Sequence, residues 1–318
     1  MTRPRSALIS IEATPYYHCI SRCVRRAFLC GKDKSGKNFN HRKQWLVDRI
    51  KLLADVFAVN VAAYAVMSNH YHLVLHIDKP SADSWDEQEV LSRWNMLYRG
   101  PDLLQRRMAG EELAEYELKE LSRLTAIWRS RLTSISWFMS CLNFVIALQA
   151  NKEDGCTGRF WEGRFKSQAL KDETALIACM AYVDLNPVRA GIAQDLPGSE
   201  YTSIRDRIRQ AQRKGKRNKS NPKLLTFGEV ETQNHNRNIV LLPYSFKDYL
   251  ELVGWQGRSY HSKKRGAIPK AVPKLLSRFN LSESEWQYLS RLIQKESSTM
   301  LDGLLNVEKF KVKQAKAG

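Results

Sequence analysis

Residues 59–77, VNVAAYAVMSNHYHLVLHI, decide the fold of this chain. Two runs rich in β-branched and aromatic residues, 59–67 and 70–77, read as strands. Ser68 and Asn69 alone separate them. A two-residue connection between such runs predicts an antiparallel β-hairpin.

Three histidines lie within the second run, and His70 and His72 are two residues apart. Side chains alternate along a strand, so these two are expected on one face, with Tyr71 on the other among core residues such as Leu73 and Leu75. Two imidazoles on one face can share a metal ion, because histidine is a common metal ligand. The alternative is a pair of half-exposed histidines on a sheet edge without a metal.

The flanking sequence adds one strand and three helices to the hairpin. The strand is expected at 16–24 and the helices at 42–57, near 134–150 and at 172–185. A strand, a helix, two strands and further helices predict an α+β domain in which helices cover an antiparallel sheet. Residues of about 86–130 are highly charged and are predicted to form a helical insertion in this domain.

The composition changes after about residue 200, which predicts two domains, 1–200 and 201–318. The run RDRIRQAQRKGKRNKSNPK is strongly basic and is expected to be a linker or a surface helix. Apolar periodicity then returns, and Ser282 with Glu285 fits a capping box in front of a helix. The second domain is therefore predicted to be helical and to bind DNA.

The charge balance indicates a phosphate-rich partner. The chain of 318 residues has 51 basic and 33 acidic side chains, a net charge of +18. Each cation near a phosphate adds affinity that does not depend on sequence. An anionic membrane surface would exploit the same charge, but no apolar run approaches the ~18–20 residues that span a bilayer. The start of the chain lacks a signal-peptide pattern, so we expect a cytoplasmic, nucleoid-associated protein.

Six cysteines are too few and too scattered for a disulfide framework in a chain of this length. Cys19, Cys23 and Cys30 are close enough in sequence for a zinc site to be considered. Their spacing lacks a short Cys-x2-Cys pair, and no second pair follows. Reduced thiols are therefore the preferred interpretation.

Tyr182 and Asn186 form a second candidate pair, because four residues make about one helical turn and place both side chains on the same face. Ala175, Ala178 and Cys179 make the rest of that stripe small. Such a face can lie close to a sheet and carry one long side chain over it. The alternative is a tyrosine used for packing and an asparagine that ends the helix.

The segment GRFWEGRFKSQALK at 158–171 alternates cations with aromatic residues. Its cations Arg159, Arg164 and Lys166 can hold phosphates, while aromatic rings between them can stack on unpaired bases. The alternative is a basic strand or loop packed through its aromatic side chains. With Arg189, these cations are the predicted DNA-binding residues.

In chain order, HYH at 70–72, RFWEGRFKSQ at 159–168 and AYVDLNPVRAG at 181–191 resemble the single-tyrosine HUH transposases. Within these, the sequence is most similar to the REP-associated tyrosine transposases. The resemblance covers roughly residues 10–200, and LNPVRAG is its most specific element. It implies a ferredoxin-like antiparallel sheet with helices on one face, to which this chain adds its helical C-terminal extension.

The resemblance also implies an activity, the metal-dependent cleavage and rejoining of single-stranded or hairpin (REP-like) DNA through a covalent 5′-phosphotyrosine. Tyr182 stands at the position of the nucleophile. His70 and His72 stand at the metal ligands, and Asn186 at the polar residue that completes the site, which implies Mg²⁺ or Mn²⁺ as cofactor. The insertion and the C-terminal region depart from the family pattern and leave open the DNA sequence and the choice between monomer and homodimer.

Two rival functions share part of this pattern. A nucleic-acid-binding regulator on the same fold would use the charge but would not need Tyr182, His70 and His72 together. A metal-dependent nuclease that activates water would use the histidines and leave Tyr182 a structural role.

Overall fold

The computed structural model describes residues 8–24, 29–31, 36–212, 224–228, 240–259, 272–294 and 300–315. A five-stranded sheet lies at its centre, with strand order β2-β3-β1-β4-β7. The strands are β1 (Tyr16–Arg22), β2 (Val59–Val66), β3 (His70–Ile77), β4 (Lys166–Leu170) and β7 (Met300–Leu301).

The strand connections give the sheet its topology. β3 pairs antiparallel with β1 and β2, β1 pairs antiparallel with β4, and β4 pairs parallel with β7. Helix α1 (His41–Val56) connects β1 to β2, and the path from β3 to β4 includes α6 (Ile135–Glu153). This βαββαβ order with β3 and β1 in the middle is ferredoxin-like. The predicted α+β class, antiparallel sheet and hairpin are confirmed.

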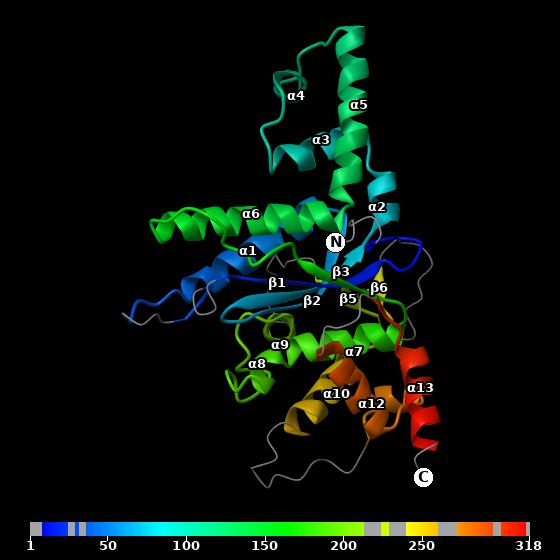
Figure 1. Cartoon of the computed structure of the whole chain (residues 1–318). Helices are drawn as coiled ribbons and strands as arrows, with labels where there is room; N and C mark the ends of the chain where they lie inside the picture. Colours follow the sequence, from blue (N-terminus) through cyan, green and yellow to red (C-terminus); the bar gives the residue numbers. More distant parts are fainter. Residues whose placement is uncertain are drawn as a thin grey trace.

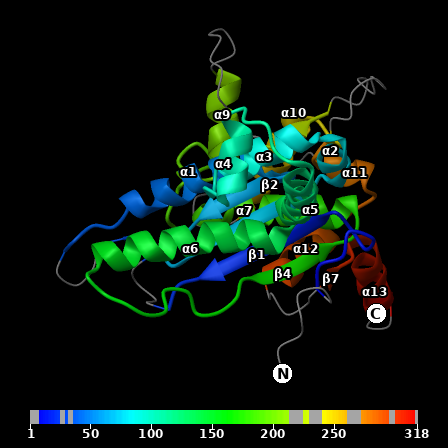
Figure 2. The same ribbon diagram turned by 90° about the horizontal axis from the view of Figure 1, so that it is seen from above.

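Helices α1 and α6 lie side by side on one face of the sheet (Figures 1 and 2). Tyr71, Leu73 and Leu75 of β3 pack into the hydrophobic core on this side, as the alternation predicted. A buried ion pair joins the two helices, because the fully buried Arg42 guanidinium donates to Glu153 at 2.7 Å and also contacts Asp154. The pair fixes the start of α1 against the end of α6.

Helix α7 (Glu173–Asp184) covers the opposite face (Figure 1). It begins at Asp172, whose carboxylate accepts a hydrogen bond from the Ala175 amide at 2.7 Å. The sheet beneath it carries alanines of β2, which let the helix approach closely. α7 is buried all round rather than on one stripe, because C-terminal helices cover its outer side.

The end of α7 differs in detail from the prediction. The helix ends at Asp184, and a separate short helix, α8 (Asn186–Arg189), follows after Leu185. Pro187 lies in the first turn of α8, where its missing N–H costs no helical hydrogen bond. Asn186 therefore starts a new helical turn instead of ending the old one.

The charged insertion is helical, as predicted, and projects away from the sheet (Figure 1). Its helices are α3 (Glu87–Asn95), α4 (Asp102–Met108) and α5 (Glu115–Leu132), and the short helix α2 (Lys79–Ser84) precedes them after β3. Trp94 of α3 stacks on Trp128 of α5, with ring centroids 5.3 Å apart. In the described ranges, no single helix is long and apolar enough to cross a bilayer. Helices α5 and α6 together have the length and composition of a membrane span, but the pair is bent by 81° at the break between them.

Most helices of the C-terminal region pack on the outer side of α7 (Figure 1), whereas the first of them contacts β2. Its elements are α9 (Ser203–Gln212), β5 (Thr226–Phe227), β6 (Leu241–Leu242), α10 (Phe246–Ser259), α11 (Lys274–Arg278), α12 (Glu283–Gln294) and α13 (Gly303–Ala315). The predicted capping box is present: Glu285 accepts from the Ser282 amide at 2.6 Å, and the Ser282 hydroxyl accepts from the Glu285 amide at 3.3 Å.

This region and α7 share one hydrophobic cluster. The basic run that starts at residue 205 begins within helix α9, and its part from 213 to 223 lies outside the described residues. The domain boundary near residue 200, and DNA binding by the second domain, stay predictions.

Candidate active site

A cluster of three histidines lies on the α7 side of the sheet. His18 of β1 and His72 of β3 are each only 1% exposed, and His70 is half-buried at the start of β3. The His18 Nε2 and His72 Nδ1 atoms are 3.0 Å apart, and the two rings stack with centroids 5.2 Å apart. The His70 and His72 ring centroids are 4.9 Å apart. We call these residues the histidine cluster.

His72 is held in its neutral form. Burial lowers its pKa well below the usual range, and the neighbouring His18 and His70 lower it further. One proton therefore resides on the ring, on Nδ1 or on Nε2. The Nε2 atom is buried and has no hydrogen-bond partner.

The hydrogen bond to His18 distinguishes the two tautomers of His72. If Nδ1 carries the proton, it donates to His18 and leaves a lone pair on Nε2. If Nε2 carries the proton, a buried N–H donor is left unsatisfied, which costs about 1–3 kcal/mol. In the tautomer with the proton on Nδ1, the Nε2 lone pair is a buried acceptor without a partner, and a cation bound there would satisfy it, so the donor set of His72 fits a metal ligand.

His70 also has a partner that orients its ring. Its Nδ1 is 2.6 Å from the amide oxygen of Asn69, so Nδ1 carries the proton and donates. This tautomer places the lone pair on Nε2, which is the nitrogen a metal ion would use.

Tyr182 lies above the histidine cluster on the same chain. Its ring meets His72 edge to face, with centroids 5.6 Å apart, and meets His18 in the same way at 6.1 Å. The guanidinium of Arg189 lies over the tyrosine ring, 4.3 Å from its centroid. Such a cation–π contact contributes about 0.5–2 kcal/mol and fixes the orientation of both side chains.

Asn186 is buried at the first residue of α8, one turn beyond Tyr182. Across the described ranges, no three His, Cys, Asp or Glu side chains are arranged to hold a metal ion. A metal at the histidine cluster would therefore need a further donor of another kind, such as the amide oxygen of Asn186. Ligation by Asn186 stays a prediction.

The aromatic residues of the segment 158–171 do not offer stacking surfaces. Phe160, Trp161 and Phe165 are all buried in the core beneath α6. The Trp161 indole N–H donates to the Asn143 carbonyl at 2.8 Å. The backbone of Trp161 also forms an antiparallel bridge with Cys23, just beyond the end of β1. The hypothesis that these rings stack on bases is therefore wrong, and the packing alternative is confirmed.

The cations of this segment remain on the surface. Arg159, Arg164 and Lys166 are exposed. Lys166 and His72 both stand opposite Ile20, one on each side of β1. Residues in one row across a sheet point to the same face, so Lys166 projects on the side of the histidine cluster.

The sequence prediction missed two residues of this site. His18 and Arg22 lie on β1, and Arg22 stands directly opposite His70. The charges of Arg22 and Arg189 are close enough to contribute to the lowered pKa of His72. Alternation along YYHCISR places His18 and Arg22 on one face of the strand. Only the register of β1 against β3 shows that this face also carries the other histidines.

The cysteines form no part of the site. Cys19, Cys23, Cys30, Cys141 and Cys179 are buried, Cys156 is partly exposed, and none of the six is in a disulfide. Burial raises the pKa of Cys30 to about 12, so the metal-free protein keeps this thiol protonated.

No family model matches the sequence, and no curated protein matches it. A solved structure described as a REP-associated tyrosine transposase bound to a REP hairpin is similar to this chain, at 13% sequence identity and a TM-score of 0.34. The match covers 76% of this chain and 99% of that one. An identity and a TM-score this low do not indicate a shared function, so the proposal below follows from the residues of this chain.

Proposed function

We propose that this protein cleaves and rejoins single-stranded or hairpin DNA through a covalent bond between Tyr182 and a 5′ phosphate. The observation that carries the proposal is the position of Tyr182. Its ring lies between the neutral His72 of the sheet and the cation of Arg189, in a chain with a net charge of +18. A packing tyrosine needs neither neighbour.

The residues of the histidine cluster would hold the cofactor, Mg²⁺ or Mn²⁺, through His70 and His72, with Asn186 as a further ligand. Imidazole nitrogens mixed with an amide oxygen suit Mn²⁺ better than Mg²⁺, which prefers oxygen ligands. When bound, the divalent ion polarises the scissile phosphate and offsets the negative charge that develops on its oxygens. His18 orients His72 through the hydrogen bond between their rings.

The covalent step is a phosphoryl transfer to tyrosine. Tyr182 gives up its phenolic proton and forms a bond from Oη to phosphorus, the phosphorus–O3′ bond breaks, and the departing 3′ oxygen takes up a proton. A free tyrosine has a pKa near ~10, so its attack at neutral pH needs positive charge nearby. Arg189 supplies such a charge at the ring, and Arg22 and Lys166 supply it at the edge of the cluster. A second 3′-hydroxyl can reverse the step, which rejoins strands.

The substrate class follows from the placement of the nucleophile. The Tyr182 side chain is only 5% exposed, between the sheet and the turn that begins α8. A single backbone can enter such a site more easily than a duplex can, and cations that line the approach can follow its phosphates.

The test uses the full chain, a labelled hairpin oligonucleotide with a single-stranded flank, and Mn²⁺. We expect a protein–DNA adduct that survives denaturation, and we expect none from Tyr182→Phe. The matched control is Tyr98→Phe, a partly exposed tyrosine on the opposite side of the sheet. Cleavage that persists without an adduct in Tyr182→Phe would show a water-activating nuclease. DNA binding without cleavage under any divalent metal would show a regulator.

A further inference from the structure

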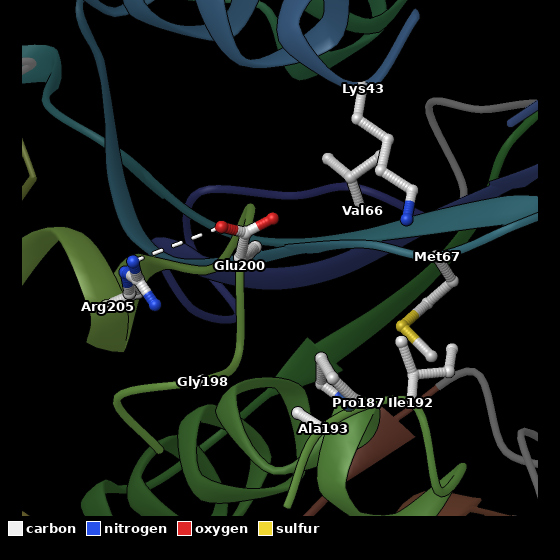
Figure 3. A pocket seen from close by; sticks show the side chains of 9 residues that line it. All are labelled: Lys43, Val66, Met67, Pro187, Ile192, Ala193, Gly198, Glu200 and Arg205. Carbon is white, nitrogen blue, oxygen red and sulfur yellow. Dashed lines mark ion pairs between the residues drawn. The ribbon is translucent and has the colours of Figure 1, made fainter. Parts of the chain in front are cut away.

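A cavity of about 250 Å³ opens at the end of β2, between the start of α1 and the turn that follows α8 (Figure 3). It is lined by residues that the mechanism above does not use: Lys43, Val66, Met67, Pro187, Ile192, Ala193, Gly198, Glu200 and Arg205. Pockets that take drug-sized ligands are larger, about 300–1,000 Å³. This cavity therefore suits a group the size of one nucleobase.

The cavity adjoins the candidate active site through both of its chain segments. The Met67 amide donates to the His70 carbonyl at 2.8 Å, across the tip of the hairpin that carries the histidines. Pro187 directly follows Asn186 and lies five residues beyond Tyr182. The cavity and the candidate active site therefore share two chain segments, the β2–β3 hairpin and the turn between α7 and α8.

The lining combines apolar walls with charge at the rim. Met67, Pro187 and Ile192 come together on one side, and Lys43 extends towards Met67 from α1 (Figure 3). Flat bases pack well on apolar and thioether surfaces, while ammonium and guanidinium groups pair with phosphates. On the other side, Glu200 and Arg205 form a long ion pair at 3.9 Å.

The backbone beside the cavity is strained. Tyr201 has a φ of 58°, a left-handed conformation that a bulky residue rarely adopts. Its carbonyl accepts a hydrogen bond from the Val66 amide at 3.0 Å, and the Lys43 ammonium lies 5.5 Å from its ring centroid. Strained residues of this kind cluster at active sites and ligand clamps, where the surrounding structure holds them in place.

We propose that this cavity takes one unpaired base of the DNA strand next to the scissile phosphate, with Lys43 and Arg205 holding the adjoining phosphates. The inference rests on the proposed function, since it assigns the neighbouring nucleotide of the same substrate. Glu200 accepts a hydrogen bond from an amino group on the base edge. Cytosine, adenine and guanine carry such a group, and thymine does not.

The test measures DNA binding without metal, so that it is independent of cleavage. Oligonucleotides with one abasic site at successive positions around the cleavage site are titrated into the wild-type protein. We expect one position, within two nucleotides of the cleaved bond, at which loss of the base weakens binding about 5- to 100-fold, the range that stacking of one base supplies. Thymine at that position should bind more weakly than cytosine, and Glu200→Gln should reduce this difference.

Two protein variants connect that position to the cavity. Ala193→Trp fills the cavity, and we expect it to bind the normal and abasic strands equally. Ala190→Trp is the matched control, because Ala190 is exposed and outside the lining, and it should keep the wild-type difference. Lys43→Ala should reduce the slope of log binding constant against log salt concentration by about one phosphate contact. Lys152→Ala, on the exposed end of α6, should reduce that slope less.

The inference is overturned if no abasic position is sensitive, or if a folded Ala193→Trp keeps the full difference between normal and abasic strands. Should Ala193→Trp fail to show cooperative thermal unfolding, Lys43→Ala and Glu200→Gln decide the matter, and wild-type behaviour of both overturns the inference. The Tyr182 adduct reports on the proposed function separately. An adduct without a sensitive base position rejects the cavity alone.

Discussion

Replacement of His18 by phenylalanine tests the organisation of the histidine cluster. The phenyl ring keeps the stacking on His72 but removes the nitrogen that lies 3.0 Å from His72 Nδ1. His72 then has no partner that fixes its tautomer, and its Nδ1 is left buried without a hydrogen bond. The lost interaction costs about 1–3 kcal/mol.

This energy translates into metal affinity, because the tautomer with a lone pair on Nε2 is the one that binds a cation. Loss of such an outer partner weakens metal binding by roughly 10- to 100-fold, which matches 1.4 kcal/mol for each factor of ten. Mn²⁺ binding to the DNA-free protein, followed by electron paramagnetic resonance, measures the change. His76→Phe is the matched control, since His76 is also a buried histidine of β3 on the same face of the sheet.

We expect His18→Phe to bind Mn²⁺ at least tenfold more weakly than the wild type, and His76→Phe to bind it almost normally. A folded His18→Phe with unchanged Mn²⁺ affinity would refute the tautomer argument. Wild-type protein without any Mn²⁺ site that depends on His72 would refute the metal proposal itself.

Three further changes have expected outcomes. Arg189→Ala should slow adduct formation about 100-fold, as removal of one charge-stabilising group does, while Arg189→Lys should restore part of the rate; equal rates in a quenched time course would contradict the role of Arg189 beside Tyr182. Burial lowers the pKa of His76 to about 4, and unfolding restores a value near ~6.5. The unfolded chain therefore binds the extra proton, and stability present above pH ~6.5 should decline by up to about 3 kcal/mol as the pH falls to ~4; urea unfolding of His76→Phe should lack this component. Asp184→Ala should lower the free energy of unfolding by about 3 kcal/mol or more, because Tyr249 and two other buried donors lose their acceptor. The surface variant Asp195→Ala is the control. A loss below about 1 kcal/mol in Asp184→Ala would contradict the estimate.

Much of the fold could be predicted from the chain because it depends on local patterns. Alternation in HYHLVL placed Tyr71, Leu73 and Leu75 on one face of β3, and their burial against α1 and α6 agrees. The spacing of Ser282 and Glu285 identified a capping box, since both hydrogen bonds form within one turn.

Other features required the packing of distant segments. A run of aromatic residues such as Phe160 and Trp161 looks the same in sequence whether it stacks on DNA or lies in a core. Only the packing of their segment against β1 and α6 shows that these two rings are buried. The two residues of β7 carry too short a pattern to indicate a strand, and they join the sheet because α12 and α13 bring them to β4.

The candidate site also combines features that can be read from the local sequence with features that depend on the packing of distant segments. The sequence by itself determined that His70 and His72 share a face, because alternation is a property of one strand, and that Tyr182 lies near the end of a helix, because helical periodicity is equally local. It could not place His18 against His72, since that contact depends on the register between β1 and β3, whose residues are separated by 54 positions. Nor could it place Tyr182 and Arg189 over the histidine cluster. That arrangement depends on the docking of α7 against a sheet face lined with small side chains, which is decided by packing between segments far apart in the chain.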